Sequence, residues 1–129
     1  MIVADSSALV AVVLGEPDAE VFRDVLGTGV IALSAASLTE TRMVVESRAG
    51  MDATRDLDLL VADAEIDVVA YDSAHAAVAH AAWRRFGKGR HPASLNLGHC
   101  MAYATARLAG APLLFKGDDF AQTDIVSAL

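Results

Sequence analysis

The chain opens with Ile2-Val3-Ala4-Asp5-Ser6-Ser7-Ala8-Leu9. Three apolar residues end at an acid, and two serines that can cap a helix follow before the apolar sequence resumes. This order predicts a buried strand that leads directly into a helix, with Asp5 at the point where the strand ends. A strand followed by a helix is the unit from which parallel sheets are built.

The same alternation of short apolar runs and helical segments continues along the chain. The expected strands cover residues 2–4, 30–33, 66–71 and 113–115. Helical character is expected over 8–14, 18–26, from one of 34–37 to 49, and over 52–64, 73–86 and 95–108. Strands that alternate with helices predict an α/β fold around a mainly parallel sheet. No repeat or linker interrupts the pattern, so we expect one domain over 1–129.

Composition and charge limit the classes of protein that fit. Of the 129 residues 54% are hydrophobic and 21% charged, which suits a folded domain with a sizeable core. The net charge of −7 argues against a protein that covers nucleic acid with positive charge, but it leaves room for a local basic patch or for metal ions held by carboxylates. Cys100 is the single cysteine, which excludes an intramolecular disulfide. Without a signal-peptide pattern or a membrane-length apolar run, we expect a cytoplasmic protein with no membrane partner.

Acidic residues follow the expected strands where ligands usually bind. In open α/β sheets, ligands lie beyond the carboxyl ends of the strands. Asp5 ends the first strand, Asp118 and Asp119 follow the last, and Glu40 lies early in the helix after the second strand. If the first and last strands are parallel neighbours, these acids converge. Clustered carboxylates repel one another unless a hard cation such as Mg²⁺ neutralises them, and such a site can hydrolyse phosphodiesters.

Each acid also has a purely structural interpretation. Asp5 can serve only as a helix cap, and Glu40 can complete a capping box with Ser37. Asp118 and Asp119 follow a glycine and can be turn formers. Only their joint placement at one edge of the sheet favours a metal site.

Six sequence segments together resemble a known family. They are Ile2 to Leu9, Glu16-Pro17-Asp18-Ala19, Ala36-Ser37-Leu38-Thr39-Glu40-Thr41, Phe86-Gly87-Lys88-Gly89-Arg90-His91, Leu95-Asn96-Leu97-Gly98-His99-Cys100, and Leu113 to Phe120 with Thr123-Asp124-Ile125. In order and spacing they resemble the VapC family, PIN-domain ribonucleases that act as toxins of bacterial type II toxin–antitoxin pairs. The resemblance implies a three-layer α/β/α PIN-like domain with a four- or five-stranded sheet, a Mg²⁺ or Mn²⁺ site, and endonucleolytic RNA cleavage. It also implies a VapB-like antitoxin and assembly as a homodimer or a toxin–antitoxin hetero-oligomer.

The resemblance assigns roles to particular residues. Asp5 and Glu40 match the first two acids of the family, and Asp119 matches the acid after the last strand better than its supporting neighbour Asp118 does. Ser7 matches the hydroxyl that supports the site. Asn96 lies in the segment Leu95 to Cys100, in the first turn of the expected helix at 95–108, and is also expected to support the site.

One match fails: His99 stands where the family pattern has an aspartate that binds metal. Imidazole is neutral or cationic and favours softer metals than Mg²⁺. His99 is therefore either an introduced inactivating change, a natural variant with weakened activity, or a sign of altered metal preference. The first two are favoured because such nucleases depend on oxygen-bound metals. A catalytically inactive PIN-like module that still binds antitoxin or RNA is the alternative function, whereas a phosphatase-like or receiver-like domain lacks its expected motif set.

Two further features point to partners. Lys88, Arg90 and Arg85 form a basic cluster before the expected helix at 95, and we expect them to contact RNA, although cations at a helix end are also favoured by its dipole. The apolar residues 8–14 and 43–45 exceed what a small core needs, so we expect an exposed apolar groove for the antitoxin or a second toxin chain.

Overall fold

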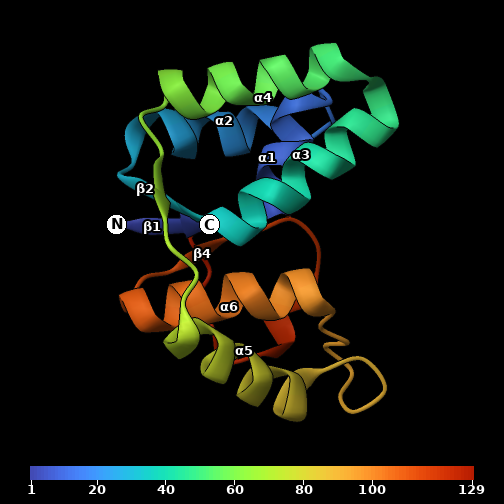
Figure 1. The fold of residues 1–129 in the computed structure, drawn as a ribbon, viewed down its shortest axis with the longest axis vertical. Helices are drawn as coiled ribbons and strands as arrows, with labels where there is room; N and C mark the ends of the chain where they lie inside the picture. The colour runs from blue at the N-terminus through green and yellow to red at the C-terminus, as the bar shows by residue number, and fades with distance from the viewer.

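The computed structural model describes residues 1–129 and contains one parallel sheet (Figure 1). Its order is β3-β2-β1-β4, with β1 paired to both β2 and β4. The strands are β1 Ile2–Ala4, β2 Ile31–Ser34, β3 Asp67–Val69 and β4 Leu113–Leu114. A single bridge joins Leu113 to Ser127 beyond β4, so the sheet has four strands and no fifth one. The first and last strands are therefore parallel neighbours, as the convergence of the acids requires.

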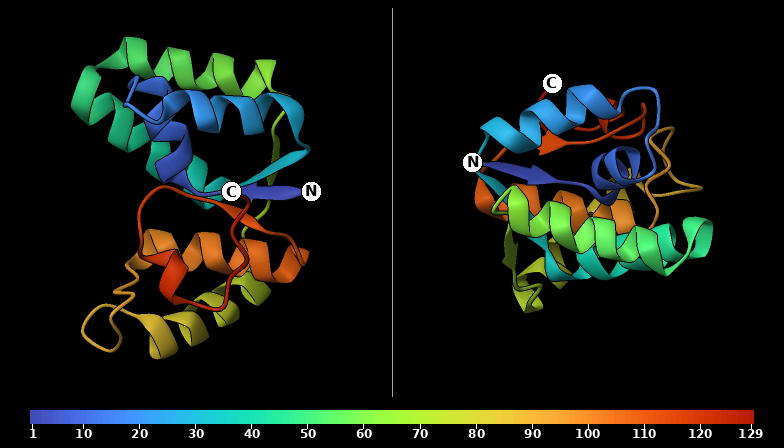
Figure 2. Two further views of the ribbon diagram at one scale, coloured as in Figure 1. Left: turned by 180° about the vertical axis from the view of Figure 1, so that it is seen from behind. Right: turned by 90° about the horizontal axis from the view of Figure 1, so that it is seen from above.

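Helices cover both faces of the sheet, which confirms the three-layer α/β/α architecture. They are α1 Ser6–Val13, α2 Ala19–Thr28, α3 Ala35–Ala49, α4 Met51–Asp63, α5 Ser73–Phe86 and α6 Leu97–Ala109, with a short 3₁₀ helix, η1, at Phe120–Gln122. Figures 1 and 2 show α1 to α4 on one side of the sheet and α5 with α6 on the other. None of the helices combines the length and apolar character that crossing a bilayer requires.

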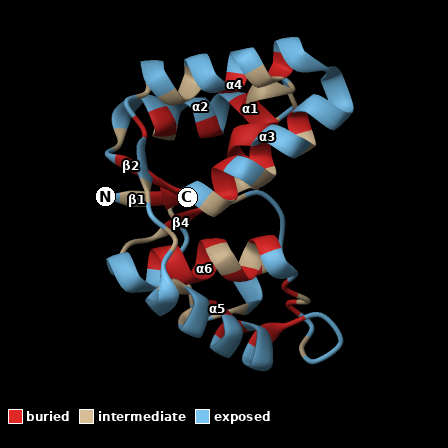
Figure 3. Ribbon diagram, in the orientation of Figure 1, coloured by how far each residue is buried: buried red, intermediate tan, exposed pale blue.

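The two sides of the sheet have separate apolar cores (Figure 3). Leu9, Phe22 and Leu57 belong to the core under α1 to α4. Phe86 and Leu113 belong to the core under α5 and α6. Strands β1, β2 and β4 contribute side chains to both cores, which explains why these short strands are almost wholly apolar.

The prediction of an exposed apolar groove along residues 8–14 is wrong for most of that segment. Residues Ala8 to Val12 are all buried, because α1 packs against α2, α3 and α4 as well as the sheet. In the second part of the expected groove, Met43 is 66% exposed whereas Val45 is fully buried. A continuous apolar run is equally typical of a helix enclosed in a core, and that is its role here.

Candidate active site

Asp5 occupies the carboxyl end of β1, between β2 and β4. Its N–H donates to the carbonyl of Leu114 at 2.9 Å, which ties the residue to the neighbouring strand. Its side chain caps α1: Oδ2 accepts from the N–H of Ser7 at 3.0 Å and from Ser7 Oγ at 2.5 Å. Asp5 therefore caps α1, and this cap uses only one of its two carboxylate oxygens.

The second oxygen of Asp5 has no partner. The residue is 1% exposed, and Oδ1 is buried without a hydrogen bond. Burial raises the pKa of Asp5 and the nearby charge of Glu40 acts in the same direction, while the bonds from Ser7 and the charge of His99 oppose the shift. An unpaired buried carboxylate oxygen is costly. Its chemistry suits a hard cation, which would supply the missing partner.

Glu40 approaches from α3 on the other side of this site. Oε1 accepts from Ser6 Oγ at 2.7 Å, so adjacent serines of α1 hold Asp5 and Glu40 separately. The carboxylate lies against Gly98 of α6, where a Cβ would overlap it. The capping-box alternative for Glu40 is wrong, because the cap of α3 is Ser34, whose Oγ accepts from the N–H of Ala36 at 3.1 Å.

His99 and Asn96 lie at the start of α6. Asn96 Oδ1 accepts from the N–H of His99 at 2.9 Å, and His99 Nδ1 accepts from the N–H of Asn96 at 3.4 Å. The imidazole also packs edge-on against Phe120, with ring centres 5.0 Å apart. Both side chains line a pocket of about 370 Å³ together with Asp5 and Glu40. Three of the four predicted metal-site residues therefore face one cavity.

Asp119 and Asp118 lie outside that pocket. Gly117, at φ 93°, turns the chain after β4 in a conformation that favours glycine, and the two acids follow. Asp119 is 49% exposed at its side chain, and its Oδ2 lies 3.8 Å from His99 Nδ1. Asp118 is exposed. No group of three His, Cys, Asp or Glu side chains lies close enough together to hold a metal ion. Asp5 and Glu40 thus offer oxygen donors on one side of the cavity, and Asp119 stays a predicted ligand.

Comparison with known proteins identifies the family. The PIN domain family matches residues 2–126. Ribonuclease VapC30 of Mycobacterium tuberculosis is 48% identical over 126 residues, which cover 97% of this chain and 96% of that protein. Ribonuclease VapC of Mycolicibacterium smegmatis is 46% identical and matches over 97% of this chain and 98% of its own length. This chain belongs to the VapC family of PIN-domain ribonucleases.

A solved VapC structure supports the fold assignment. Mycobacterium tuberculosis VapC20, described as a toxin that cleaves the sarcin–ricin loop, superposes with a TM-score of 0.82 over 99% of this chain and 98% of its own. VapBC2 from Rickettsia felis, bound to a DNA fragment from its promoter, gives a TM-score of 0.75 over 98% and 96%. Their sequence identities of 17% and 13% mean that they establish the fold alone.

Ser6, Arg48 and Lys116 also line the pocket of this VapC chain, in positions that the sequence analysis did not predict. Ser6 positions Glu40, and it stands directly after Asp5 at the strand exit. Arg48 lines the pocket about two helical turns after Glu40, and this spacing of eight residues could have revealed it. Lys116 donates its backbone N–H to Ser7 Oγ at 3.0 Å, and its Nζ donates to Glu16 at 3.1 Å.

The predicted RNA-binding cations do not line this pocket. Arg85 pairs with Asp124 at 3.0 Å on the far side of α6. Arg90 places its guanidinium 4.2 Å from the ring centre of Trp83, and Lys88 lines a separate cavity beside that ring. Contact of these residues with RNA stays a prediction, and Arg85 already has a structural partner.

Proposed function

We propose that this VapC-family chain is the toxin of a type II toxin–antitoxin pair and an endoribonuclease that depends on Mg²⁺ or Mn²⁺. The observation that carries the proposal is the buried, unpaired Oδ1 of Asp5, a residue that lines a pocket together with Glu40. Family membership favours RNA as the substrate. Metal-assisted phosphodiester hydrolysis uses a water nucleophile and needs no cysteine or serine, and the hydroxyls of Ser6 and Ser7 serve here to hold the two carboxylates.

Asp5 and Glu40 would hold the cation. When bound, a divalent ion neutralises phosphate charge and lowers the pKa of a coordinated water. Ser7 fixes Oδ2 of Asp5 and leaves Oδ1 without a protein partner, while Ser6 fixes one oxygen of Glu40. Lys116 is tied to Ser7 through its backbone and brings a cation to the same rim. RNA phosphate would enter between these groups.

His99 weakens this site in our proposal. It adds a nitrogen where an aspartate would add a hard, anionic oxygen ligand, and its Nδ1 is engaged by the Asn96 N–H. Although Asp5, Glu40 and His99 line the same cavity, no three acidic or histidine side chains lie close enough together to hold a metal ion, which supports the same view. These observations also favour a second candidate function, a PIN module that binds RNA or antitoxin without cleaving.

The partner implied by the proposal is a VapB-like antitoxin. The Rickettsia felis relative by fold was solved as a VapBC assembly, which supports such a partner for this chain. We propose that the toxin acts in the cytoplasm, as a homodimer or as a toxin–antitoxin hetero-oligomer. Co-purification of the chain with the product of an adjacent small gene tests this part.

Cleavage of RNA by the purified chain tests the catalytic proposal. The chain is incubated with total bacterial RNA in Mg²⁺, Mn²⁺ or EDTA, and new 5′ ends are mapped by sequencing. We expect discrete ends that depend on the metal and disappear in Asp5→Asn. Ends that persist in EDTA or in the variant would contradict it. Saturable RNA binding without new ends at saturating Mn²⁺ would favour the binding module.

A further inference from the structure

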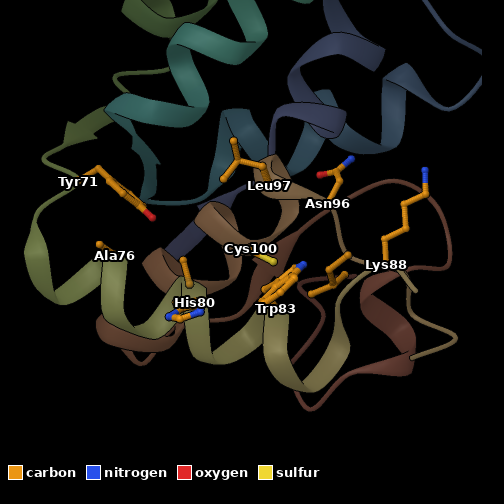
Figure 4. A pocket seen from close by; sticks show the side chains of 10 residues that line it. Tyr71, Ala76, His80, Trp83, Lys88, Asn96, Leu97 and Cys100 are labelled. Atoms are coloured by element: carbon orange, nitrogen blue, oxygen red, sulfur yellow. The ribbon is translucent and has the colours of Figure 1, made fainter. Parts of the chain in front are cut away.

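A second pocket, of about 430 Å³, lies between α5 and α6 (Figure 4). In Figure 4, His80 and Trp83 project from α5, and Leu97 and Cys100 come from the first turns of α6. Asn96, the cap of α6, lines both this pocket and the one that contains Asp5 and Glu40. The two cavities are therefore neighbours across the start of one helix.

The charge of this pocket differs from that of the whole chain. The protein has 17 acids against 10 lysines and arginines, yet no acid lines this cavity. Its one charged lining residue is Lys88, and the guanidinium of Arg90 stacks on the ring of Trp83 at its side. The remaining wall is aromatic or aliphatic for the most part. Such a wall suits a flat, π-bearing group that is joined to an anion.

Asn96 supplies a polar group at the junction of the two cavities. Its Oδ1 accepts from the N–H of His99, but no protein group accepts from its Nδ2. Two N–H donors are therefore available to a ligand that reaches from one pocket into the other. The edge of a nucleobase and a phosphate oxygen are both suitable acceptors.

We propose that this pocket binds one unstacked nucleobase of the RNA, next to the phosphodiester bond presented to Asp5 and Glu40. The inference rests on the proposed ribonuclease function and gives it a base-binding subsite. Proteins read single-stranded RNA by stacking splayed bases on aromatic side chains, and cations beside the stack hold the backbone. Trp83 provides the aromatic wall, Lys88 and Arg90 the cations, and Asn96 the contact toward the cleavage site.

A second copy of the chain is the competing occupant. Leu97 is 75% exposed at the rim, which is typical of a protein contact. The nucleobase is favoured because the pocket is concave, contains no acid and shares Asn96 with the cavity that contains Asp5 and Glu40. A homotypic interface does not account for the position of the pocket beside the cavity of Asp5 and Glu40.

Trp83 is the only tryptophan, so its fluorescence reports directly on this pocket. The full chain is titrated in EDTA with hexa-adenylate, hexacytidylate and hexauridylate. We expect saturable quenching, with at least one sequence bound more tightly than the others. Ala76→Phe introduces a larger side chain at an exposed position of the pocket wall and should weaken binding about tenfold. Ala74→Phe, at an exposed position of α5 outside the wall, is the matched control and should bind like the unmodified chain.

The result that overturns the proposal is quenching that is absent, or equal in Ala76→Phe and Ala74→Phe. Thermal unfolding shows whether both variants fold. If Ala76→Phe does not fold, the binding of labelled RNA to Trp83→Phe gives a second measurement. Loss of dimerisation in Ala76→Phe with unchanged RNA affinity also overturns it, in favour of a second copy. Quenching without RNA cleavage in Mg²⁺ or Mn²⁺ would contradict the ribonuclease and leave the base pocket supported.

Discussion

Asp124 and Asp5, two aspartates near β4, have very different surroundings. Asp124, on the segment after η1, accepts from Tyr103 Oη at 2.6 Å and pairs with Arg85 at 3.0 Å and Arg107 at 3.9 Å. The hydrogen bond from Tyr103 lowers its pKa, and the two arginines act in the same direction. Asp5 has a bound oxygen and an unbound one, and burial raises its pKa.

The difference separates a structural carboxylate from the one that we propose to be functional. Asp124 has its partners within the chain, so it fastens the C-terminal segment to α5 and α6. Asp5 is buried where its charge is costly, and one of its oxygens has no partner within the chain. Buried polar groups normally find partners, so a buried group without one is a reason to expect a ligand.

Substitution of Asp5 should give the largest effect and tests the functional half of this comparison. Asp5→Asn should lower RNA cleavage by about a thousandfold. Its stability should not fall: a raised folded pKa means that the ionised carboxylate costs stability once the pH exceeds the unfolded value, and the neutral amide removes that cost. Thermal unfolding at pH 7.5 should show an equal or higher midpoint. Mn²⁺ should raise the midpoint of the unmodified chain only.

Asp124→Asn is the matched control for that experiment. It should lower the unfolding midpoint and leave cleavage nearly unchanged, because Asp124 lies away from the acidic pocket and is held by Tyr103 and Arg85. If Asp5→Asn were less stable than Asp124→Asn, the distinction between the two aspartates would be wrong.

The position of Glu40 is tested by the glycine on which it rests. Gly98→Ala places a Cβ in the volume of the Glu40 carboxylate, so that carboxylate must move. The end of a flexible side chain can shift at little cost to folding, and alanine favours the helix. We expect cleavage to fall about thirtyfold with no loss of stability. The measurement pairs initial cleavage rates with thermal unfolding.

Gly27→Ala on α2 provides the comparison for that variant, because a Cβ there meets nothing within 4 Å. It should stabilise the chain by about 0.5–1 kcal/mol and keep full activity. Equal activity of Gly98→Ala and Gly27→Ala would show that the placement of Glu40 does not matter for cleavage.

Much of the site could be predicted because it depends on local pattern and sheet topology. The run from Ile2 to Asp5 predicted a strand with an acid at its end, and parallel strands align their carboxyl ends, which brought Asp5 and Glu40 to one cavity. The cap of α3 was left open among residues 34–37 because Ser34 and Ser37 are both good capping residues, and only the backbone at the strand exit selects Ser34.

Other features depended on contacts that sequence spacing does not reveal. Arg85 was expected to contact RNA, but it meets Asp124, 39 residues away, through the packing of α5 and α6. The burial of α1 depended on three helices closing over it, and an apolar run fits a core or a groove equally well. The exclusion of Asp119 from the pocket follows from the turn at Gly117, whose direction the pattern left open.

His99 makes the acidic pocket less anionic, and reversing that change sharpens the contrast with Asp124. His99→Asp adds a carboxylate beside Asp5 and Glu40, so we expect Mg²⁺-dependent cleavage to increase about tenfold. Without metal the added negative charge should lower stability, and Mg²⁺ should restore it. Cleavage rates and unfolding midpoints are compared across a Mg²⁺ titration. Equal cleavage by both forms, in matched metal and free of contaminating nuclease, would show that His99 does not impair the site.

Removal of the Tyr103 hydroxyl should give the smallest effect and tests the structural half of the comparison. Tyr103→Phe removes the hydrogen bond to Asp124 and should cost about 1–2 kcal/mol of stability, with cleavage unchanged.

The pH dependence of the unmodified chain's stability follows from two pKa shifts of opposite sign. The lowered pKa of Asp124 gives stability that is present above its unfolded value of 3.8 and lost as the pH falls through the folded one. The Tyr103 pKa is raised from 10.0 to about 12, chiefly by burial, so stability also falls as the pH rises between these values. Unfolding by urea across the pH range should show both losses in the unmodified chain. In Tyr103→Phe the alkaline loss should vanish and the acid loss should shrink, because the hydroxyl is the main cause of the Asp124 shift. An unchanged profile would mean that Asp124 is held by Arg85 and Arg107 rather than by Tyr103.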